Sequence, residues 1–213
     1  MKMTPDSRTR IIRVAALFII TLGLVLNFLQ GNALRMLTYY TILSNVMVWL
    51  CLLLLLHKSI SQSPRFMIFK LVVTTAVLLT FFVYHLVLYP VISKMEGFDY
   101  PWPIDFLVHT FGPLYMLFDF LMFDRTREMK DIYGWYGVLG PLLYYLFVVI
   151  YGACGGRFFG DEQSSRYPYF FLDPEIIGIF GVVLSVLGIA LFSAFIGFGT
   201  VLVRSMIRNR RSV

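Results

Sequence analysis

The chain has 213 residues, of which 59% are hydrophobic and only 14% are charged. This apolar share exceeds the roughly 45–50% of soluble domains, so a single water-soluble core would leave much apolar surface exposed. The net charge of +6 does not indicate nucleic-acid binding, because the charged residues fall at the ends of apolar runs, where membrane anchors lie. We therefore expect one domain over residues 1–213, embedded in a lipid bilayer and without a nucleic-acid partner.

Charged residues divide the chain into long uncharged runs. Five of these runs have 21, 21, 23, 25 and 28 residues, and about 20 residues suffice to cross the hydrocarbon core. A sixth apolar run, near 103–123, is interrupted by Asp105, His109 and Asp119. We predict an all-α, polytopic membrane protein with six transmembrane helices, at about 11–32, 34–57, 68–93, 103–123, 133–155 and 174–203.

The orientation follows from lysine and arginine, which concentrate on the cytoplasmic side of membrane proteins. The N-terminal segment, the connections at 58–70 and 125–130 and the C-terminal tail hold 14 of the 18 basic residues. Both termini are therefore predicted to be cytoplasmic, in the plasma membrane, which is the inner membrane if the source is bacterial. The first helix follows Arg8 and Arg13 as in a signal peptide, but its apolar core is too long for one and no cleavage site follows.

Polar residues inside the predicted helices are candidates for function, because they are costly in hydrocarbon. Thr38, Thr41 and Asn45 are spaced i, i+3 and i+7, so they share one face of a continuous helix. At 1.5 Å per residue, these threonines, His85 on the third helix and His109 on the fourth lie roughly 8–12 Å below the outer end of the bundle. The sequence therefore predicts a polar site in the outer half of the membrane.

A proline within the fourth helix bears on the geometry of His109. Pro113 has no N–H, so it removes the main-chain bond to residue i−4, which is His109, and we expect a kink there. Asp105 lies one turn before His109. We interpret Asp105 as an anchor at the membrane interface, with orientation of the imidazole as the alternative.

The remaining charged and sulfur-containing residues have structural interpretations. Asp119 and Asp124 are predicted to be anchors at the inner interface, near Arg125 and Arg127. The outer connection at 157–174 is either a lid or a plain connector, and we favour the connector. The two cysteines form neither a disulfide framework nor a metal-binding pattern, so no metal ion and no cofactor is predicted.

Three short motifs resemble a known family. Residues 37–45 (LTYYTILSN), 109–113 (HTFGP) and 118–123 (FDFLMF) are similar to segments of the androgen-inducible/androgen-dependent integral membrane protein family and its bacterial six-helix relatives. The resemblance implies hydrolysis of fatty acid esters of hydroxy fatty acids by an intramembrane threonine and histidine. By resemblance the histidine is His109, and the threonine is Thr38, with Thr41 as the alternative.

The chain departs from the animal members at two places. Residues 106–108 stand where those members have an Asn-His pair, and residues 41–45 replace the stretch after their threonine. The identity of the ester therefore stays open, as does the oligomeric state.

The first functional hypothesis is a hydrolase whose substrate, a fatty acid ester or another membrane lipid, enters sideways from the bilayer. His109 would take the proton of a threonine hydroxyl and later protonate the leaving alcohol. Ser44 or Asn45 would donate to the oxyanion, the negatively charged oxygen that forms on the ester carbonyl. His85 would act as a second base or bind the acyl carboxylate.

Two further hypotheses use the same polar residues. One is a binding or transport protein for a small lipid or an ion, without catalysis. The other, a remote one, is a b-type cytochrome in which His85 and His109 are the axial ligands of one haem.

Overall fold

The computed structural model describes residues 5–57, 60, 63–95, 100–123, 129–158 and 165–210. Within these ranges the regular structure is helical, apart from one isolated bridge between Phe158 and Ser165. Five helices of the described part are long and apolar enough to cross a membrane: Ser7–Leu29, Pro64–Ile92, Trp102–Phe123, Asp131–Ala153 and Pro174–Asn209. The prediction of a helical membrane protein is therefore confirmed.

The helices follow one another with short irregular turns inside them. The first half of the chain contains α1 (Pro5–Leu29), α2 (Ala33–Met36), α3 (Tyr40–Leu55), α5 (Pro64–Val83), the π-helical turn η1 (Tyr84–Leu88) and α6 (Tyr89–Ile92). The second half contains α7 (Trp102–Phe106), the π-helical turn η2 (Leu107–Phe111), α8 (Gly112–Phe123), the 3₁₀ helix η3 (Asp131–Val138), α9 (Leu139–Ala153), the short 3₁₀ helix η5 (Phe170–Leu172) and α10 (Pro174–Asn209).

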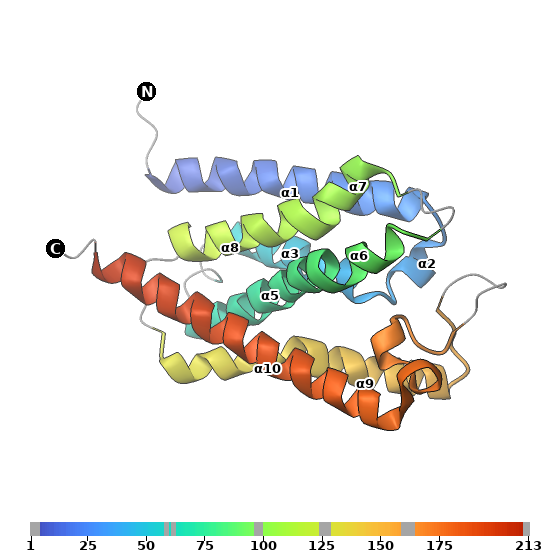
Figure 1. The fold of residues 1–213 in the computed structure, drawn as a ribbon. Coiled ribbons are helices and arrows are strands. Elements are labelled where there is room, and N and C mark those ends of the chain that lie inside the picture. The colour runs from blue at the N-terminus through green and yellow to red at the C-terminus, as the bar shows by residue number, and fades with distance from the viewer. Residues whose placement is uncertain are drawn as a thin grey trace.

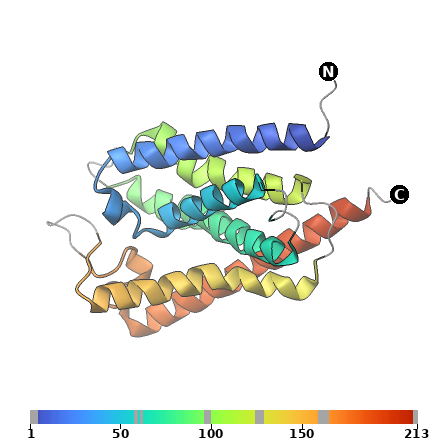
Figure 2. The same ribbon diagram turned by 180° about the vertical axis from the view of Figure 1, so that it is seen from behind.

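The bundle has three layers, with α3, α5 and α8 lying between α1 on one side and the α9–α10 pair on the other (Figures 1 and 2). The main core lies where α1, α3, α5 and α8 meet. It includes Ile20 of α1, Val48 of α3, Val77 of α5 and Met116 of α8. The beginning of α1 and the end of α10 lie at the same end of the bundle (Figure 1).

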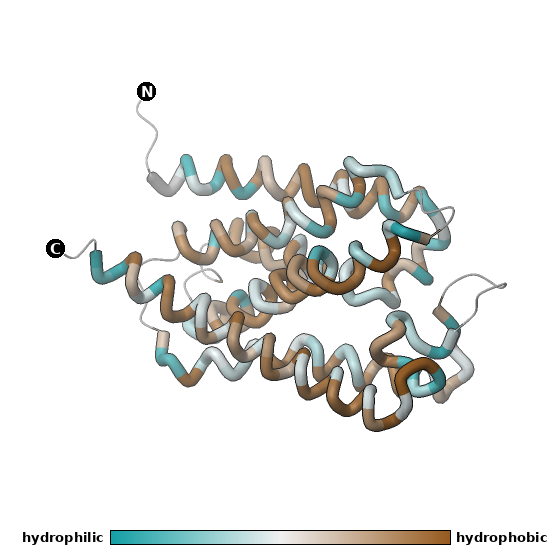
Figure 3. The backbone as a smooth tube through the Cα atoms, in the orientation of Figure 1, coloured by the Kyte–Doolittle hydropathy of each residue, from teal (hydrophilic) through white to brown (hydrophobic). Residues whose placement is uncertain are grey.

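The outer surface of the bundle is suited to hydrocarbon. Phe18 of α1 and Phe195 of α10 are 71% and 72% exposed, and many large apolar residues share this outward position. Apolar residues cover most of the length of the helices, and hydrophilic ones gather near the two ends of the bundle (Figure 3). A soluble protein rarely exposes so continuous an apolar surface, so lipid is its natural environment.

The α9–α10 pair is joined by small residues near the end of the bundle that holds both termini. A Cβ atom on Gly137 of η3 would lie only 2.7 Å from the carbonyl oxygen of Ser193, and one on Gly197 would overlap the main chain of Gly134. Small residues let two helix backbones approach closely, which is how many membrane helices associate. The two helices are therefore locked together along this stretch.

The predicted second helix, 34–57, is interrupted near its beginning. The Asn32 side chain accepts hydrogen bonds from the N–H groups of Leu34 and Arg35 and so caps α2, which ends at Met36. Thr38 lies in the turn that follows, and α3 begins only at Tyr40. Thr41 and Asn45 share a helix as predicted, but placing Thr38 on the same helix face was wrong.

Candidate functional site

The centre of the candidate site is a hydrogen-bonded pair on the long helix Trp102–Phe123. Asp105 Oδ1 lies 2.8 Å from Nδ1 of His109, one helical turn further on, and His109 is buried. When the carboxylate accepts the proton on Nδ1, the neutral imidazole keeps Nε2 as its acceptor. The hydrogen bond agrees with the alternative interpretation, in which Asp105 orients the imidazole of His109.

An aromatic ring fixes the plane of the imidazole. Tyr84 stacks on His109 with the ring centroids 3.5 Å apart and an angle of 7° between the planes. Tyr100 approaches the same imidazole edge-on, with 6.3 Å between centroids. Burial raises the pKa of Tyr100 to about 12, although the hydrogen bond from Asn27 lowers it, so this phenol stays neutral at pH 7.

His109 lies inside a π-helical turn that explains the predicted kink. The N–H of Gly112 bonds to the carbonyl of Leu107, five residues back rather than four. The next residue, Pro113, lies five residues after Val108 but has no N–H. The Val108 carbonyl therefore receives no main-chain hydrogen bond from Pro113. Asn45 supplies the replacement, with Nδ2 donating to the Val108 carbonyl at 2.8 Å.

Asn45 also holds α3, the helix that carries Thr41. The same Nδ2 atom donates to the carbonyl of Thr41 at 2.8 Å, so one amide group links the main chains of α3 and η2. Gly112 makes this approach possible, because a Cβ atom there would overlap Oδ1 of Asn45. Both amide hydrogens of Asn45 are thereby used in positioning the helices, whereas the sequence suggested an oxyanion donor.

Two further predicted residues connect neighbouring helices. Nε2 of His85, in η1, lies 3.0 Å from the hydroxyl of Thr110, and its ring stands edge-on to Tyr84. The hydroxyl of Ser44, in α3, lies 2.9 Å from that of Thr80 in α5 and donates to the Thr41 carbonyl at 3.0 Å. These contacts fix α5 and η1 against α3 and η2.

The two candidate threonines have different surroundings. The Thr38 hydroxyl donates to the carbonyl of Arg35 at 2.7 Å, and the Thr38 carbonyl accepts a hydrogen bond from Tyr144 at 2.9 Å. Thr38 is buried and does not line the pocket described next, whereas Thr41 does. Thr41 is therefore the threonine whose side chain is accessible from a cavity.

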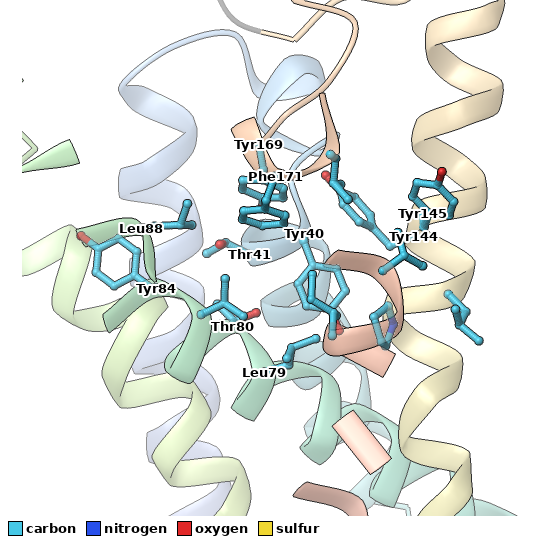
Figure 4. A pocket seen from close by; sticks show the side chains of 16 residues that line it. Tyr40, Thr41, Leu79, Thr80, Tyr84, Leu88, Tyr144, Tyr145, Tyr169 and Phe171 are labelled. Atoms are coloured by element: carbon cyan, nitrogen blue, oxygen red, sulfur yellow. The ribbon is translucent and has the colours of Figure 1, made fainter. Parts of the chain in front are cut away.

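The pocket lies between the central helices and the α9–α10 pair (Figure 4). It holds about 590 Å³ of empty space including its open side, and carbon atoms form almost all of its wall. Tyr84 is the link to the histidine, because one face of its ring stacks on His109 and its side chain also lines the pocket. The lining residues are Tyr40, Thr41, Leu79, Thr80, Val83, Tyr84, Leu88, Pro141, Leu142, Tyr144, Tyr145, Tyr169, Phe171, Leu172, Val186 and Ile189.

The segment after the outer connection covers one end of this pocket. Tyr169, Phe171 and Leu172 line it, and Figure 4 shows the Tyr169 and Phe171 rings beside Thr41. Burial raises the pKa of Tyr169 to about 12, while hydrogen bonds with the Tyr40 main chain and the Thr41 and Tyr144 side chains lower it. Tyr169 is therefore a neutral part of the cover. The sequence analysis assigned neither Tyr144 nor Tyr169 a part in the site.

A second polar cluster lies apart from the histidines. Asp119 is fully buried and accepts hydrogen bonds from Arg13 at 2.8 and 3.2 Å and from Lys70. The Lys70 and Arg204 side chains both lie over the Phe120 ring. Asp119 is thus a buried ion-pair centre joining α1, α5 and α8, which corrects its assignment as an interface anchor. Its expected neighbours Asp124, Arg125 and Arg127 lie outside the described residues.

The geometry also bears on metal and haem binding. Among the described residues, no group of three or more histidine, cysteine or acidic side chains is arranged to hold a metal ion. A haem does not fit between His85 and His109, because Nε2 of His85 bonds to Thr110 and neither imidazole lines the pocket.

Compared with protein-family models, curated proteins and solved structures, the chain matches none of them.

Proposed function

We propose that the chain is an intramembrane hydrolase of lipid esters that crosses the membrane six times, with both termini in the cytoplasm. The sixth crossing is α3, whose 16 residues span about 24 Å and are extended outward by α2 and its turn. An even number of crossings agrees with the two chain ends lying at one end of the bundle (Figure 1). The basic residues at that end support a cytoplasmic location.

The observation that carries the proposal is the Asp105–His109 pair, whose imidazole stacks on Tyr84, a residue that lines an apolar pocket. A histidine oriented through Nδ1 has its Nε2 ready to accept a proton, which is the arrangement of a general base. The carbon-lined pocket suits an alkyl chain, because burial there leaves few polar groups without partners. Together these features favour a substrate that has both an ester group and a fatty acyl chain.

Of the two threonines, we propose Thr41 as the nucleophile, with Thr38 as the alternative. Thr41 lines the pocket, and its main chain is linked to that of Val108, next to His109, through the Asn45 amide. His109 takes the hydroxyl proton as the Thr41 oxygen attacks the ester carbonyl, and then gives this proton to the departing alcohol. Water, deprotonated by His109, attacks the resulting acyl-threonine; the C–O bond to Thr41 breaks, His109 returns the proton to the Thr41 oxygen, and the fatty acid leaves.

The test is cleavage of branched fatty acid esters by the purified protein in detergent. We expect His109→Ala and Thr41→Val to remove activity, Thr41→Ser to restore part of it, and Asp105→Asn to lower kcat by about 10²-fold or more. Thr38→Val serves as the matched control. Thermal unfolding of each variant confirms that it is folded.

Three outcomes would change the assignment. Full activity in His109→Ala would remove the histidine from the mechanism. Loss of activity in Thr38→Val with retention in Thr41→Val would move the nucleophile to Thr38. No cleavage by the unaltered protein across several acyl lengths would favour lipid binding without catalysis.

A further inference from the structure

The pocket has a side that faces the bilayer rather than water. Its lining includes Leu88 at the end of η1 and Val186 and Ile189 on α10. Immediate neighbours of these residues point outward, with Val87 of η1 40% exposed and Leu187 of α10 55% exposed. The boundary of the pocket therefore adjoins the lipid-facing surface at this place.

The packing of α10 leaves this side less closed than the others. Among the described elements, α10 packs against α5, α8, η3, α9 and η5, with no comparable packing against η1 or α6. Near the other end of the bundle the small residues Gly134 and Gly197 hold α10 tightly against η3. The helix pair is thus fixed at one end and separated from η1 at the other, where the pocket lies.

The outer end of the pocket is covered. Tyr169, Phe171 and Leu172 line the pocket there, and the Tyr169 ring lies 6.4 Å from the Tyr144 ring, measured between centroids. Gly178, near the start of α10, has φ 71° and ψ 163°, a conformation open essentially only to glycine. This break separates the first turn of α10, next to the covering segment, from the rest of the helix.

We propose that the pocket takes up one straight fatty acyl chain directly from the bilayer, through a portal between Leu88 and Val186. The fatty acyl chain passes from one hydrocarbon environment to another, so its removal from water contributes little to binding. Packing against the aromatic walls of the pocket therefore decides which acyl chains fit. The inference rests on the proposed function only for the cleavage that follows uptake, because the portal and the pocket equally serve a binding protein.

The test uses a palmitic acid analogue with a photoreactive diazirine in mid-chain, added to phosphatidylcholine vesicles that contain the full-length protein. After illumination, mass spectrometry locates the labelled residues. We expect labels on pocket residues such as Leu79, Val83 and Leu142, and we expect excess unlabelled palmitate to suppress them.

Three variants test the portal itself. Val186→Trp should lower pocket labelling at least tenfold, whereas Leu187→Trp, on the lipid-facing side of the same helix, should leave it unchanged. Val186→Ala widens the portal and should keep or increase labelling. This variant therefore separates the effect of bulk in the portal from damage to the fold that any change at position 186 would cause. Equal pocket labelling in Val186→Trp and the parent, or labels confined to residues outside the pocket, would overturn the inference.

Labelling and hydrolysis separate this inference from the proposed function. Pocket labelling that Val186→Trp prevents, in a protein that cleaves no ester, would leave the portal standing and refute the hydrolase. Ester cleavage with labelling that Val186→Trp does not alter would refute the portal and leave the hydrolase standing.

Discussion

Replacing Asp119 by asparagine should destabilise the bundle more than any other single charge change in the described helices. Its carboxylate has no exposed surface and is held by Arg13 of α1 and Lys70 of α5, whose side chain is also fully buried. Asparagine keeps the size of the side chain but removes the negative charge and introduces an N–H₂ group facing cationic donors. Two buried cations then lose the carboxylate that binds them.

The expected size of the effect follows from this burial. Removing one partner of a buried ion pair costs about 3–5 kcal/mol, because the remaining charge keeps its desolvation penalty. In a chain of this length, 1 kcal/mol changes the melting temperature by about 2–4 °C. We therefore expect Asp119→Asn to melt on the order of 10 °C below the parent protein.

The two cysteines provide the assay. Cys51 is fully buried in the core and Cys154 is exposed, so a thiol-reactive dye reports unfolding through Cys51 in a Cys154→Ser background. Asp131→Asn, which removes an exposed carboxylate at the start of η3, is the matched control and should not shift the transition. A melting temperature for Asp119→Asn within about 2 °C of the parent, less than the shift for 1 kcal/mol, would refute the reasoning.

The same unfolding assay tests three further changes. Asn45→Ala should lower the free energy of unfolding by about 1–3 kcal/mol, because it leaves the Val108 carbonyl without its donor. The same change should lower kcat more than KM, and an unaltered kcat would contradict a positioning role. Gly112→Ala should cost a similar amount through overlap with Oδ1 of Asn45, and the double variant should lose less than the sum; full additivity would count against a shared cause. Gly197→Ala should lower the free energy of unfolding by about 1–3 kcal/mol, because the added methyl group pushes α10 away from Gly134. An unchanged free energy of unfolding would show that this contact is loosely packed.

The sequence predicted the helices well, because uncharged runs of membrane-spanning length leave few other structures possible in hydrocarbon. It failed at the start of the second helix, where residues 37–39 contain neither glycine nor proline to mark the turn. Pro113 correctly indicated an irregularity beside His109. The similar turn before Pro90 was missed, although Tyr84 and His85 lie in it.

The contacts between distant segments were beyond single-sequence reasoning. The i, i+4 spacing of Asp105 and His109 is visible in the sequence. It does not indicate whether Asp105 anchors the helix at the membrane interface or bonds to the imidazole. Nothing local to Lys70 or Asp119 indicates that their helices are neighbours, because helix order in space is set by packing and not by the hydropathy of each run. For the same reason, nothing in the sequence around Tyr169 indicates that this residue lies near Thr41.

The Arg13–Asp119 ion pair has a consequence for how the protein is made. Its two residues are 106 positions apart in the chain, and synthesis proceeds at about 5–20 residues per second. The guanidinium of the first helix therefore waits about 5–20 s before the carboxylate of α8 leaves the ribosome. During that time it stays in the headgroup region among lipid phosphates, since a lone charge in hydrocarbon is costly. We therefore expect the first helix to take its final position only after α8 has been synthesised.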